Sequence, residues 1–421
     1  MGNHDAQRSV EAVVRDSYGR LVSFLAARSR DLAAAEDAFG DALCAALETW
    51  RERGVPDKPD AWLFTAARRR LTDQARRSAV RTEAVASLRV LADELADVAT
   101  TEIPDERLRL LFVCAHPAIA ADVHTPLMLR TVLGLDAARI ASAFCVAPAT
   151  MGQRLARAKA KIRLAGIPFE VPSTRDLPAR LDAVLEAIYA AYGVGWDDVA
   201  GADPRRCGLS EEAIWLARLV VRLLPNEPEG RGLLALMLHC EARRAARRGS
   251  DGAYVPLSEQ DVALWSRALI DDAERELAVA ATRNAAGRFQ LEAAIQSVHA
   301  HRAVTGRTNW DAIALFYEAL VQHTGALGAR VGRAAALGNA QGAAVGLTAL
   351  DAMAATAIAY QPYWAVRAHL LAELGETAAA EAAYARAIEL SEDPDVRAFL
   401  LERRTVRRTA CAKARGGRRR D

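Results

Sequence analysis

The stretch APATMGQRLARAKAKIR, residues 147–163, decides how the middle of the chain is interpreted. It holds five basic residues and no acidic one, although the chain as a whole carries 55 Lys and Arg against 53 Asp and Glu. Its apolar residues recur at spacings of four, three and four, which predicts a helix with one buried stripe. The stripe consists of Met151, Leu155, Ala158 and Ile162. Because a helix that only has to be soluble usually mixes its charges, this one is predicted to face something acidic.

A shorter helix is predicted just before this stretch. Asp136 can cap it, and Ile140, Ala141 and Phe144 would face inward. Pro148 suits the first position of the basic helix, so the segment has the pattern helix, turn, helix. The exposed face would present Thr150, Gln153, Arg154, Arg157 and Lys161. Glutamine and arginine suit base edges in the major groove and other basic residues suit phosphates, although a solvated amphipathic helix remains the alternative.

A second basic helix is predicted within PDKPDAWLFTAARRRLTDQARR, residues 56–77. Pro56 and Pro59 hold a loop, Asp60 is a candidate cap, and Trp62 opens the helix. An aromatic ring next to arginines suits a nucleic-acid strand whose bases are unstacked, because the ring stacks and the guanidinium binds the backbone. The alternative is that Trp62 is a core residue.

The preceding segment, residues 33–50, predicts a helix with an acidic outer surface. Its inward residues would be Leu32, Phe39, Ala46 and Trp50. Its outer residues would be Glu36, Asp37, Asp41 and Glu48. Such a face is unsuited to DNA and suited to a basic protein surface, with ordinary solvation as the alternative.

The apolar spacing is three and four almost throughout, and β-type alternation is nearly absent, so the chain is predicted to be all-α. Pro168, Pro172 and Pro178 mark a boundary. The predicted parts are 1–80, a linker at 81–103, 104–166, a Pro-rich linker at 167–177, 178–404, and a disordered basic tail at 405–421.

The third part contains one segment with the spacing of a tetratricopeptide repeat, YWAVRAHLLAELGETAAAEAAYARAIELSEDPD. Ala368 and Ala380 would let two antiparallel helices approach, while Trp364 and Tyr384 would fill the space between them. The prediction is therefore a tetratricopeptide-like helical domain with one recognisable repeat.

Several classes of protein find no support in the sequence. There is no run of about 18 apolar residues and no secretory pattern at the start, so we expect a cytoplasmic protein without membrane contact. No GxxxxGK[ST], HExxH or GxSxG motif is present, and the six cysteines form no CxxC pair. We therefore expect no enzyme activity, cofactor or metal, and His299 and His301 are interpreted as packing residues.

The four segments in this order resemble a bacterial sigma factor of the sigma-70 family, extracytoplasmic-function type. The quoted matches are AEDAFGDALCAALETW, PDAWLFTAARRRLTDQARR, DERLRLLFVCAHPAI and ARIASAFCVAPATMGQRLARAKAKIR. The resemblance covers about residues 8–166 and implies two small helical domains, sigma region 2 at 1–80 and a helix-turn-helix region 4 at 104–166. The remainder is similar to the tetratricopeptide-like extension of one subgroup, which implies a regulatory domain.

The resemblance also implies roles for residues. The acidic helix with Glu36, Asp37, Asp41 and Glu48 would bind the β′ clamp helices of core RNA polymerase, and residues 105–135 would face the β-flap. The −10 element of promoter DNA would be captured by Trp62, Arg68, Arg69, Arg70, Arg76 and Arg77. The −35 element would be read by Thr150, Gln153, Arg154, Arg157 and Lys161. Gly40 departs from the glutamine that is usual in the family.

Three functions follow as hypotheses. The first is an alternative sigma factor that directs promoter recognition and transcription initiation, with a helical domain that binds a regulatory protein or ligand. The second is a helix-turn-helix regulator with a helical sensor domain, which leaves Trp62 and its arginines without a purpose. The third is an adaptor whose tetratricopeptide-like part binds a partner.

Overall fold

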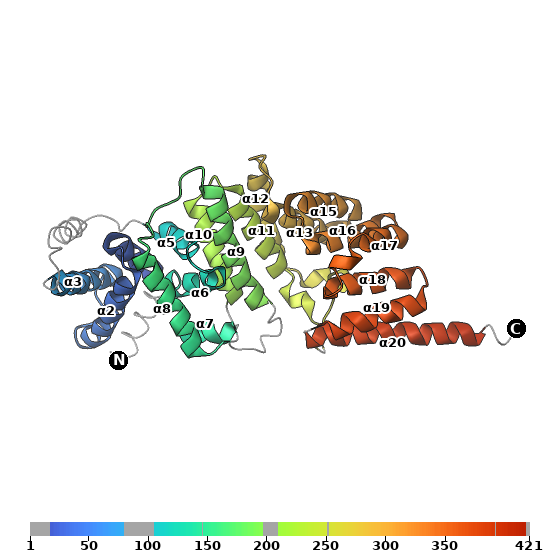
Figure 1. Cartoon of the computed structure of the whole chain (residues 1–421), viewed down its shortest axis with the longest axis horizontal. Coiled ribbons are helices and arrows are strands. Elements are labelled where there is room, and N and C mark those ends of the chain that lie inside the picture. The colour runs from blue at the N-terminus through green and yellow to red at the C-terminus, as the bar shows by residue number, and fades with distance from the viewer. Residues whose placement is uncertain are drawn as a thin grey trace. The chain divides into compact units, whose positions relative to one another are not determined.

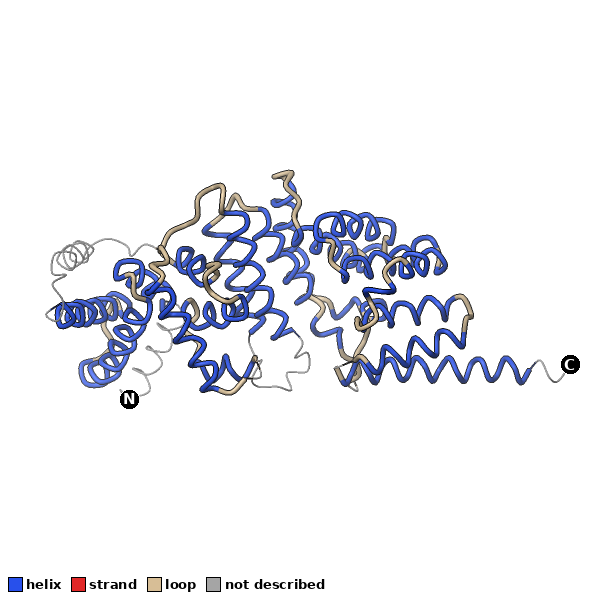
Figure 2. The backbone as a smooth tube through the Cα atoms, in the orientation of Figure 1, coloured by secondary structure: helices blue, strands red, loops and turns tan. Residues whose placement is uncertain are grey.

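The computed structural model describes residues 17–79, 105–144, 146–196, 209–250, 252–391 and 393–417. These residues are helices and connecting loops, and Figure 2 shows no strand among them. Within these ranges the β-type pairing is one isolated bridge, between Arg248 and Tyr254. The all-α prediction is confirmed. The described helices include none long and apolar enough to cross a membrane.

The helices follow one another along the chain as labelled in Figure 1. Residues 17–29 form a helix, followed by α2 (Leu32–Arg53), α3 (Pro59–Ala79), α5 (Arg107–Cys114), α6 (Ala121–Thr131), α7 (Ala137–Ala143), α8 (Pro148–Leu164), α9 (Leu177–Trp196), α10 (Leu209–Leu223), α11 (Pro228–Glu241), α12 (Arg267–Ala281), α13 (Arg288–Ala300), α14 (Arg302–Thr305), α15 (Trp310–Thr324), α16 (Leu327–Gln341), α17 (Ala343–Asp351), α18 (Gln361–Glu373), α19 (Thr377–Glu389) and α20 (Pro394–Gly417). Short 3-10 turns are η2 (Arg244–Arg247), η3 (Leu257–Glu259), η4 (Val262–Leu264) and η5 (Ala354–Thr356). The chain divides into two compact units, residues 1–216 and 217–421.

The first unit begins with a core made by residues 17–29, α2 and α3. The Asp31 carboxylate accepts a hydrogen bond from the Ala34 amide at 3.1 Å and so caps α2. The predicted inward residues of α2, Leu32, Phe39, Ala46 and Trp50, are all buried. Helix α3 adds Leu63, Phe64, Ala67 and Leu71 to this core. It begins at Pro59, one residue before the predicted cap Asp60, because proline fits the first helical turn.

The second part of the first unit contains the predicted pair of helices around Pro148. The Asp136 carboxylate accepts a hydrogen bond from the Arg139 amide at 2.8 Å, which satisfies an amide at the start of α7. Pro148 is the first residue of α8. The predicted stripe of Met151, Leu155, Ala158 and Ile162 is buried, with no member more than 6% exposed. The spacing argument for this helix is therefore confirmed.

Helix α9 packs on α5 and α6, where the sequence analysis expected the start of a separate domain. The Thr125 hydroxyl of α6 donates to the Ala187 carbonyl at 2.9 Å, and Arg180 donates to the Phe112 carbonyl at 2.6 Å. Leu181, Val184, Leu185, Ile188 and Tyr192 are buried. Prolines 168 and 172 end a helix, but they do not end the hydrophobic core. The predicted boundary at 167–177 is therefore corrected, because the compact unit extends to residue 216.

The second unit is a series of helices packed on their neighbours in sequence, among them α11 on α12, α15 on α16 and α18 on α19. The segment predicted as a repeat forms α18 and α19, with Gly375 at φ +78° in the turn between them. Ala368 and Ala380 are buried at 0% and 4% exposure, and Tyr384 is buried with them. Trp364 is half-buried, and its indole N–H donates to the Ile358 carbonyl at 2.9 Å.

The end of the chain differs from the prediction of a disordered tail at 405–421. Helix α20 continues from Pro394 to Gly417. Arginine, lysine and alanine are good helix formers, and no glycine interrupts the helix before Gly416. The predicted linker at 81–103 lies outside the described residues.

Candidate nucleic-acid and protein interfaces

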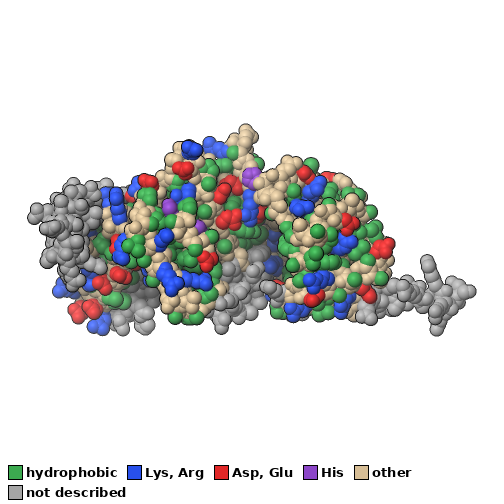
Figure 3. Space-filling model, viewed as in Figure 1, with side chains coloured by type: hydrophobic (Ala, Val, Ile, Leu, Met, Phe, Trp, Pro, Cys, Tyr) green, Lys and Arg blue, Asp and Glu red, His purple; other side chains and the backbone are tan. Residues whose placement is uncertain are grey.

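The exposed face of α8 carries the side chains that the sequence analysis assigns to the −35 element. Thr150, Gln153, Arg157 and Lys161 are exposed, and Arg154 is half-exposed. At about 100° per residue all five lie within one sector of about 100°, opposite the buried stripe. In the view of Figure 3, Lys and Arg side chains are visible where Figure 1 places α6 to α8.

Two cations of this face are free to meet a ligand. Arg157 and Lys161 form no ion pair with any residue that the structure describes. Arg154 lies 3.6 Å from the Asp122 carboxylate of α6, at the edge of the face. The helix itself contains no acidic residue, so this face offers hydrogen-bond donors and positive charge together.

Helix α3 presents a second basic surface beside aromatic rings. Trp62 is half-buried, and its ring meets the buried Trp50 edge-to-face at 5.6 Å. Arg68 lies 6.0 Å from the centre of the Phe64 ring, while Arg69 and Arg70 are exposed. Trp62 is thus part of the core on one side and accessible on the other. Arg76 and Arg77 belong to α3, but their side chains lie outside the described residues.

The acidic residues of α2 divide between two surfaces. Asp37, Asp41 and Glu48 are exposed on one face, at spacings of four and seven residues. The Asp41 carboxylate lies 3.1 Å from Arg70 of α3. Cys44 is exposed on the same face.

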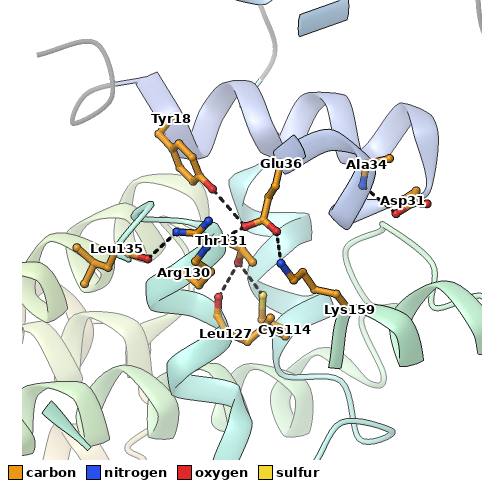
Figure 4. A network of polar contacts seen from close by, with 10 residues as sticks. All are labelled: Tyr18, Asp31, Ala34, Glu36, Cys114, Leu127, Arg130, Thr131, Leu135 and Lys159. Atoms are coloured by element: carbon orange, nitrogen blue, oxygen red, sulfur yellow. Dashed lines mark hydrogen bonds and ion pairs between the residues drawn. The ribbon is translucent and has the colours of Figure 1, made fainter. Parts of the chain in front are cut away.

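Glu36 is buried, and the predicted outer position of its side chain is wrong. Its carboxylate accepts a hydrogen bond from Tyr18 at 3.2 Å, lies 2.7 Å from the Lys159 ammonium of α8 and 3.5 Å from Arg130 of α6 (Figure 4). Residue 36 lies about 100° around the helix from Asp37, next to the core stripe. Its partners are up to 123 residues away along the chain, so α2 alone gave no sign of them. The predicted polymerase-binding role of Glu36 stays a prediction.

The side chains that contact Glu36 come from several helices. Arg130 also donates to the Leu135 carbonyl at 3.1 Å. Burial, and next the charge of Glu36, raises the pKa of the Tyr18 hydroxyl, which therefore stays a neutral donor. The sequence analysis missed Tyr18, Arg130 and Lys159. The available signal was that Lys159 lies on the opposite side of α8 from the predicted DNA face.

The second unit has a groove of about 630 Å³ whose wall includes Ser297, His301, Arg307, Trp310 and Asn339. His299 lies next to it and packs edge-to-face on Trp310, with ring centres 5.4 Å apart. Burial first, and Arg243 second, lowers the pKa of His299 to about 4. His299 therefore packs as a neutral ring.

Comparison with known proteins identifies the N-terminal part. Residues 13–81 match sigma-70 region 2, a range that includes α2 and α3. This match supports a relationship of the N-terminal part to the sigma-70 family. Over 377 residues the chain is 37% identical to the uncharacterized protein R00370 of Rhizobium meliloti (strain 1021), and the alignment covers 88% of this chain and 89% of the relative, so the two belong to one family.

The chain also carries a match in its middle. Residues 180–281 match a family of unknown function, DUF6596, where the sequence analysis expected the start of a tetratricopeptide-like extension. No solved structure matches the chain. Region 2 implies binding to core RNA polymerase and promoter DNA, and the exposed surfaces of α2 and α3 lie within that match.

Proposed function

We propose that this protein is a sigma factor of the extracytoplasmic-function type, which binds core RNA polymerase and directs promoter recognition and transcription initiation. The observation that carries the proposal is the division of charge in the first unit. One acidic face on α2 accompanies two separate basic surfaces, on α3 and on α8. A DNA-binding regulator needs one basic surface, whereas promoter opening needs a surface for duplex and another for a melted strand. The function places the protein in the cytoplasm, with the polymerase.

The acidic face of α2 is proposed to bind the β′ clamp helices. Asp37, Asp41 and Glu48 are exposed and of one sign, so they fit a basic protein surface by charge complementarity. Gly40 and Cys44 lie close to this face, so the backbone there is accessible to a partner.

Helix α3 is proposed to capture the melted −10 element. The exposed part of Trp62 offers an aromatic surface for an unstacked base, and Arg68 and Arg69 offer charge to the backbone next to it. Single-stranded binding of this kind needs no base-specific hydrogen bond, which agrees with the scarcity of amide side chains on this face.

Helix α8 is proposed to read the −35 element in the major groove. Gln153 and Arg154 can each make two hydrogen bonds to a base edge, while Arg157 and Lys161 neutralise phosphates. Residues 105–135, which include α5 and α6, are proposed to face the β-flap, so that the polymerase holds the reading helix in place.

The second unit is proposed to regulate initiation by binding a protein or ligand. A test of this role must keep α9 with the first unit, because α9 covers α5 and α6. A protein that ends after Leu223, the last residue of α10, keeps α9 without dividing a helix, whereas one that ends after Gly166 would expose a hydrophobic core. Changed promoter-specific transcription after truncation at Leu223 is the expected result.

The experiment that tests the main proposal is transcription with core RNA polymerase from a genomic promoter library. Arg157→Glu should abolish initiation at promoters with a −35 element, because it places an acid against phosphate. The matched control is Arg222→Glu, an exposed arginine of the second unit that lines no groove named here, which should leave initiation unchanged. Absence of core polymerase binding, together with a palindromic footprint on promoter duplex, would favour the helix-turn-helix regulator instead. DNA binding that Arg157→Glu leaves unaffected would favour the adaptor.

A further inference from the structure

The groove of the second unit lies where three helix ends and a loop meet. Its wall is formed by the last turn of α13, by α14 with the loop at residues 306–309, by the first turn of α15 and by the last turn of α16. Gly306, at φ +72°, ends α14 and turns the chain into this loop. The volume of about 630 Å³ lies within the range of roughly 300–1,000 Å³ that small-molecule sites have. The groove therefore has room for a small organic molecule.

Several hydrogen-bond donors that the protein does not use itself line this groove. Arg307 is exposed and forms no ion pair with any residue that the structure describes. The Thr308 hydroxyl and the exposed ring of His301 also have no partner within the described ranges. Of the Asn309 amide only the oxygen is bonded, to the N–H of Ala312. Carboxylate and phosphate groups supply acceptor oxygens, so a ligand that carries either group fits this set of donors.

Arginines close to the groove give it a positive potential. Arg302 donates to two backbone carbonyls at 2.9 and 3.0 Å, and Arg243 donates to a carbonyl, an amide oxygen and a thiol. Neither forms an ion pair with a described residue. Burial first, and then the charges of Arg243 and Arg302, lowers the pKa of His299 beside the groove. Among the described lining residues Asp311 is the one carboxylate, so the groove favours an anion over a cation.

Trp310 supplies a flat wall. Its ring is half-buried and lies edge-to-face with the ring of His299, at 5.4 Å between the ring centres. That contact orients the indole, and the rest of the side chain lines the groove. A ring that is already held in place loses little freedom when a second ring packs on it. The apolar part of a ligand that fits this wall is therefore a planar ring.

We propose that the groove binds a small anion that carries a planar ring, with the carboxylate or phosphate on Arg307 and the ring against Trp310. A guanidinium presents two parallel N–H groups, which match two oxygens of either anion. A nucleoside monophosphate and an aromatic carboxylate share this chemistry. Binding is a property of the second unit alone, whereas any effect of the ligand on transcription rests on the proposed function.

An amide side chain on α16 distinguishes these two sources of the anion. Asn339 is exposed at the groove, and its Nδ2 donates to the Ala335 carbonyl at 2.9 Å, which leaves Oδ1 available to a ligand. Amide groups match the donors and acceptors on the edge of an adenine ring. A plain aromatic ring has no such edge. Asn339 should therefore contribute to the binding of a nucleotide and not to that of an aromatic carboxylate.

Binding is measured by fluorine NMR of the full-length protein labelled with 5-fluorotryptophan, in which Trp310→Phe assigns the Trp310 signal. The two complete probes are adenosine 5′-monophosphate and 2-naphthoate. Adenosine and 2-naphthalenemethanol carry the ring without the charge, while ribose 5-phosphate and acetate carry the charge without the ring. At least one complete probe should shift the Trp310 signal and bind roughly tenfold more tightly than both of its partial probes, because each of these lacks either the charged hydrogen bond or the stacked ring.

Arg307→Ala tests the position of the anion. It should weaken binding of the complete probe roughly tenfold and leave binding of the uncharged partial probe unchanged. The matched control is Arg222→Ala, an exposed arginine of the same unit outside the groove, which should leave every affinity unchanged. Asp311→Asn removes a negative charge from the wall and should tighten binding of the anion. Circular dichroism checks that each variant stays helical.

Three results would overturn the proposal. The first is that neither complete probe shifts the Trp310 signal at millimolar concentration. The second is that ribose 5-phosphate or acetate binds as tightly as the matching complete probe, which would show a surface that attracts any anion. The third is unchanged binding of the complete probe in Arg307→Ala. Selective binding that Arg307→Ala weakens would support the proposal, and Asn339→Ala would then identify a nucleotide if it weakens binding of adenosine 5′-monophosphate.

Transcription with core RNA polymerase tests whether the ligand regulates initiation. The complete probe that binds should change initiation by the wild type and not by Arg307→Ala. Unchanged initiation by wild-type protein with the probe bound would refute the regulatory role and leave the binding site intact. Wild-type protein that supports no initiation at any promoter would refute the proposed function, and the NMR measurement would still decide whether the groove binds the anion.

Discussion

Acid should destabilise the second unit through His239, a histidine with almost no access to water. It lies on α11 with 1% of its surface exposed, and neither ring nitrogen has a hydrogen-bond partner among the described residues. Burial first, and the charge of Arg243 second, lowers the pKa of His239 to about 4. The carboxylate of Glu274 on α12 lies 3.5 Å from Nε2 of His239. The same carboxylate accepts a hydrogen bond from the Ser297 hydroxyl at 2.6 Å.

The direction in which stability changes with pH follows from which state of the chain, folded or unfolded, binds the proton more readily. The unfolded chain takes up a proton near pH 6.5, whereas folded His239 stays neutral down to about pH 4. The contribution of neutral His239 to the unfolding free energy of the second unit is therefore fully present above pH 6.5 and is lost as the pH falls towards 4. Between pH 7 and pH 5 the loss amounts to about 2 kcal/mol for this one group.

Hydrogen exchange of α11 peptides in the full-length protein measures this loss, after correction for the intrinsic pH dependence of exchange. The free energy of opening of α11 should fall by about 2 kcal/mol from pH 7 to pH 5. His239→Leu removes the titrating group and should flatten this dependence, apart from the share due to His299, whose pKa is lowered in the same direction. An unchanged slope in His239→Leu would refute the reasoning.

Three further predictions concern stability. Gly40→Ala should stabilise the first unit by about 0.5–1 kcal/mol in urea denaturation, because a Cβ there meets no atom within 4 Å and glycine is unfavourable inside a helix. Gly346→Ala should destabilise the second unit by about 1–3 kcal/mol, since its Cβ would lie 2.8 Å from the Ala334 carbonyl oxygen; an unchanged melting temperature would contradict this. Ile188→Ala, at a fully buried position of α9, should lower the unfolding free energy of the first unit by about 2–5 kcal/mol, measured by hydrogen exchange of α5 and α6.

Periodicity predicted much of the local structure. The apolar stripes of α2 and α8 are buried as expected. Apolar residues every three or four positions lie on one face of a helix, and water favours the arrangement in which that face packs against the rest of the protein. The pair of helices α18 and α19 was also predictable, since small residues at the crossing point and a turn glycine are local requirements, while the tetratricopeptide assignment of this pair stays a prediction. These features depend on neighbours within a few turns of the same chain segment.

Features that depend on distant residues were not predictable in this way. Glu36 looks like a surface acid on a helical wheel, and only the approach of Lys159 and Arg130 buries it. The role of α9 was hidden for a similar reason, because prolines mark the end of a helix and say nothing about which core the next helix joins. The length of α20 was misjudged because a high density of charge was interpreted as disorder, although arginine and lysine favour helices.

The packing of α9 on α5 and α6 has a consequence for how such a protein can change over evolutionary time. The loop around Pro168 is the natural place to cut the gene, yet a cut there would take away helix α9, which covers part of the core formed by α5 and α6. Loss or exchange of the C-terminal region by recombination at that loop would leave α5 and α6 uncovered. Helices α5, α6 and α9 are therefore inherited together, and recombination can exchange the C-terminal region only further along the chain.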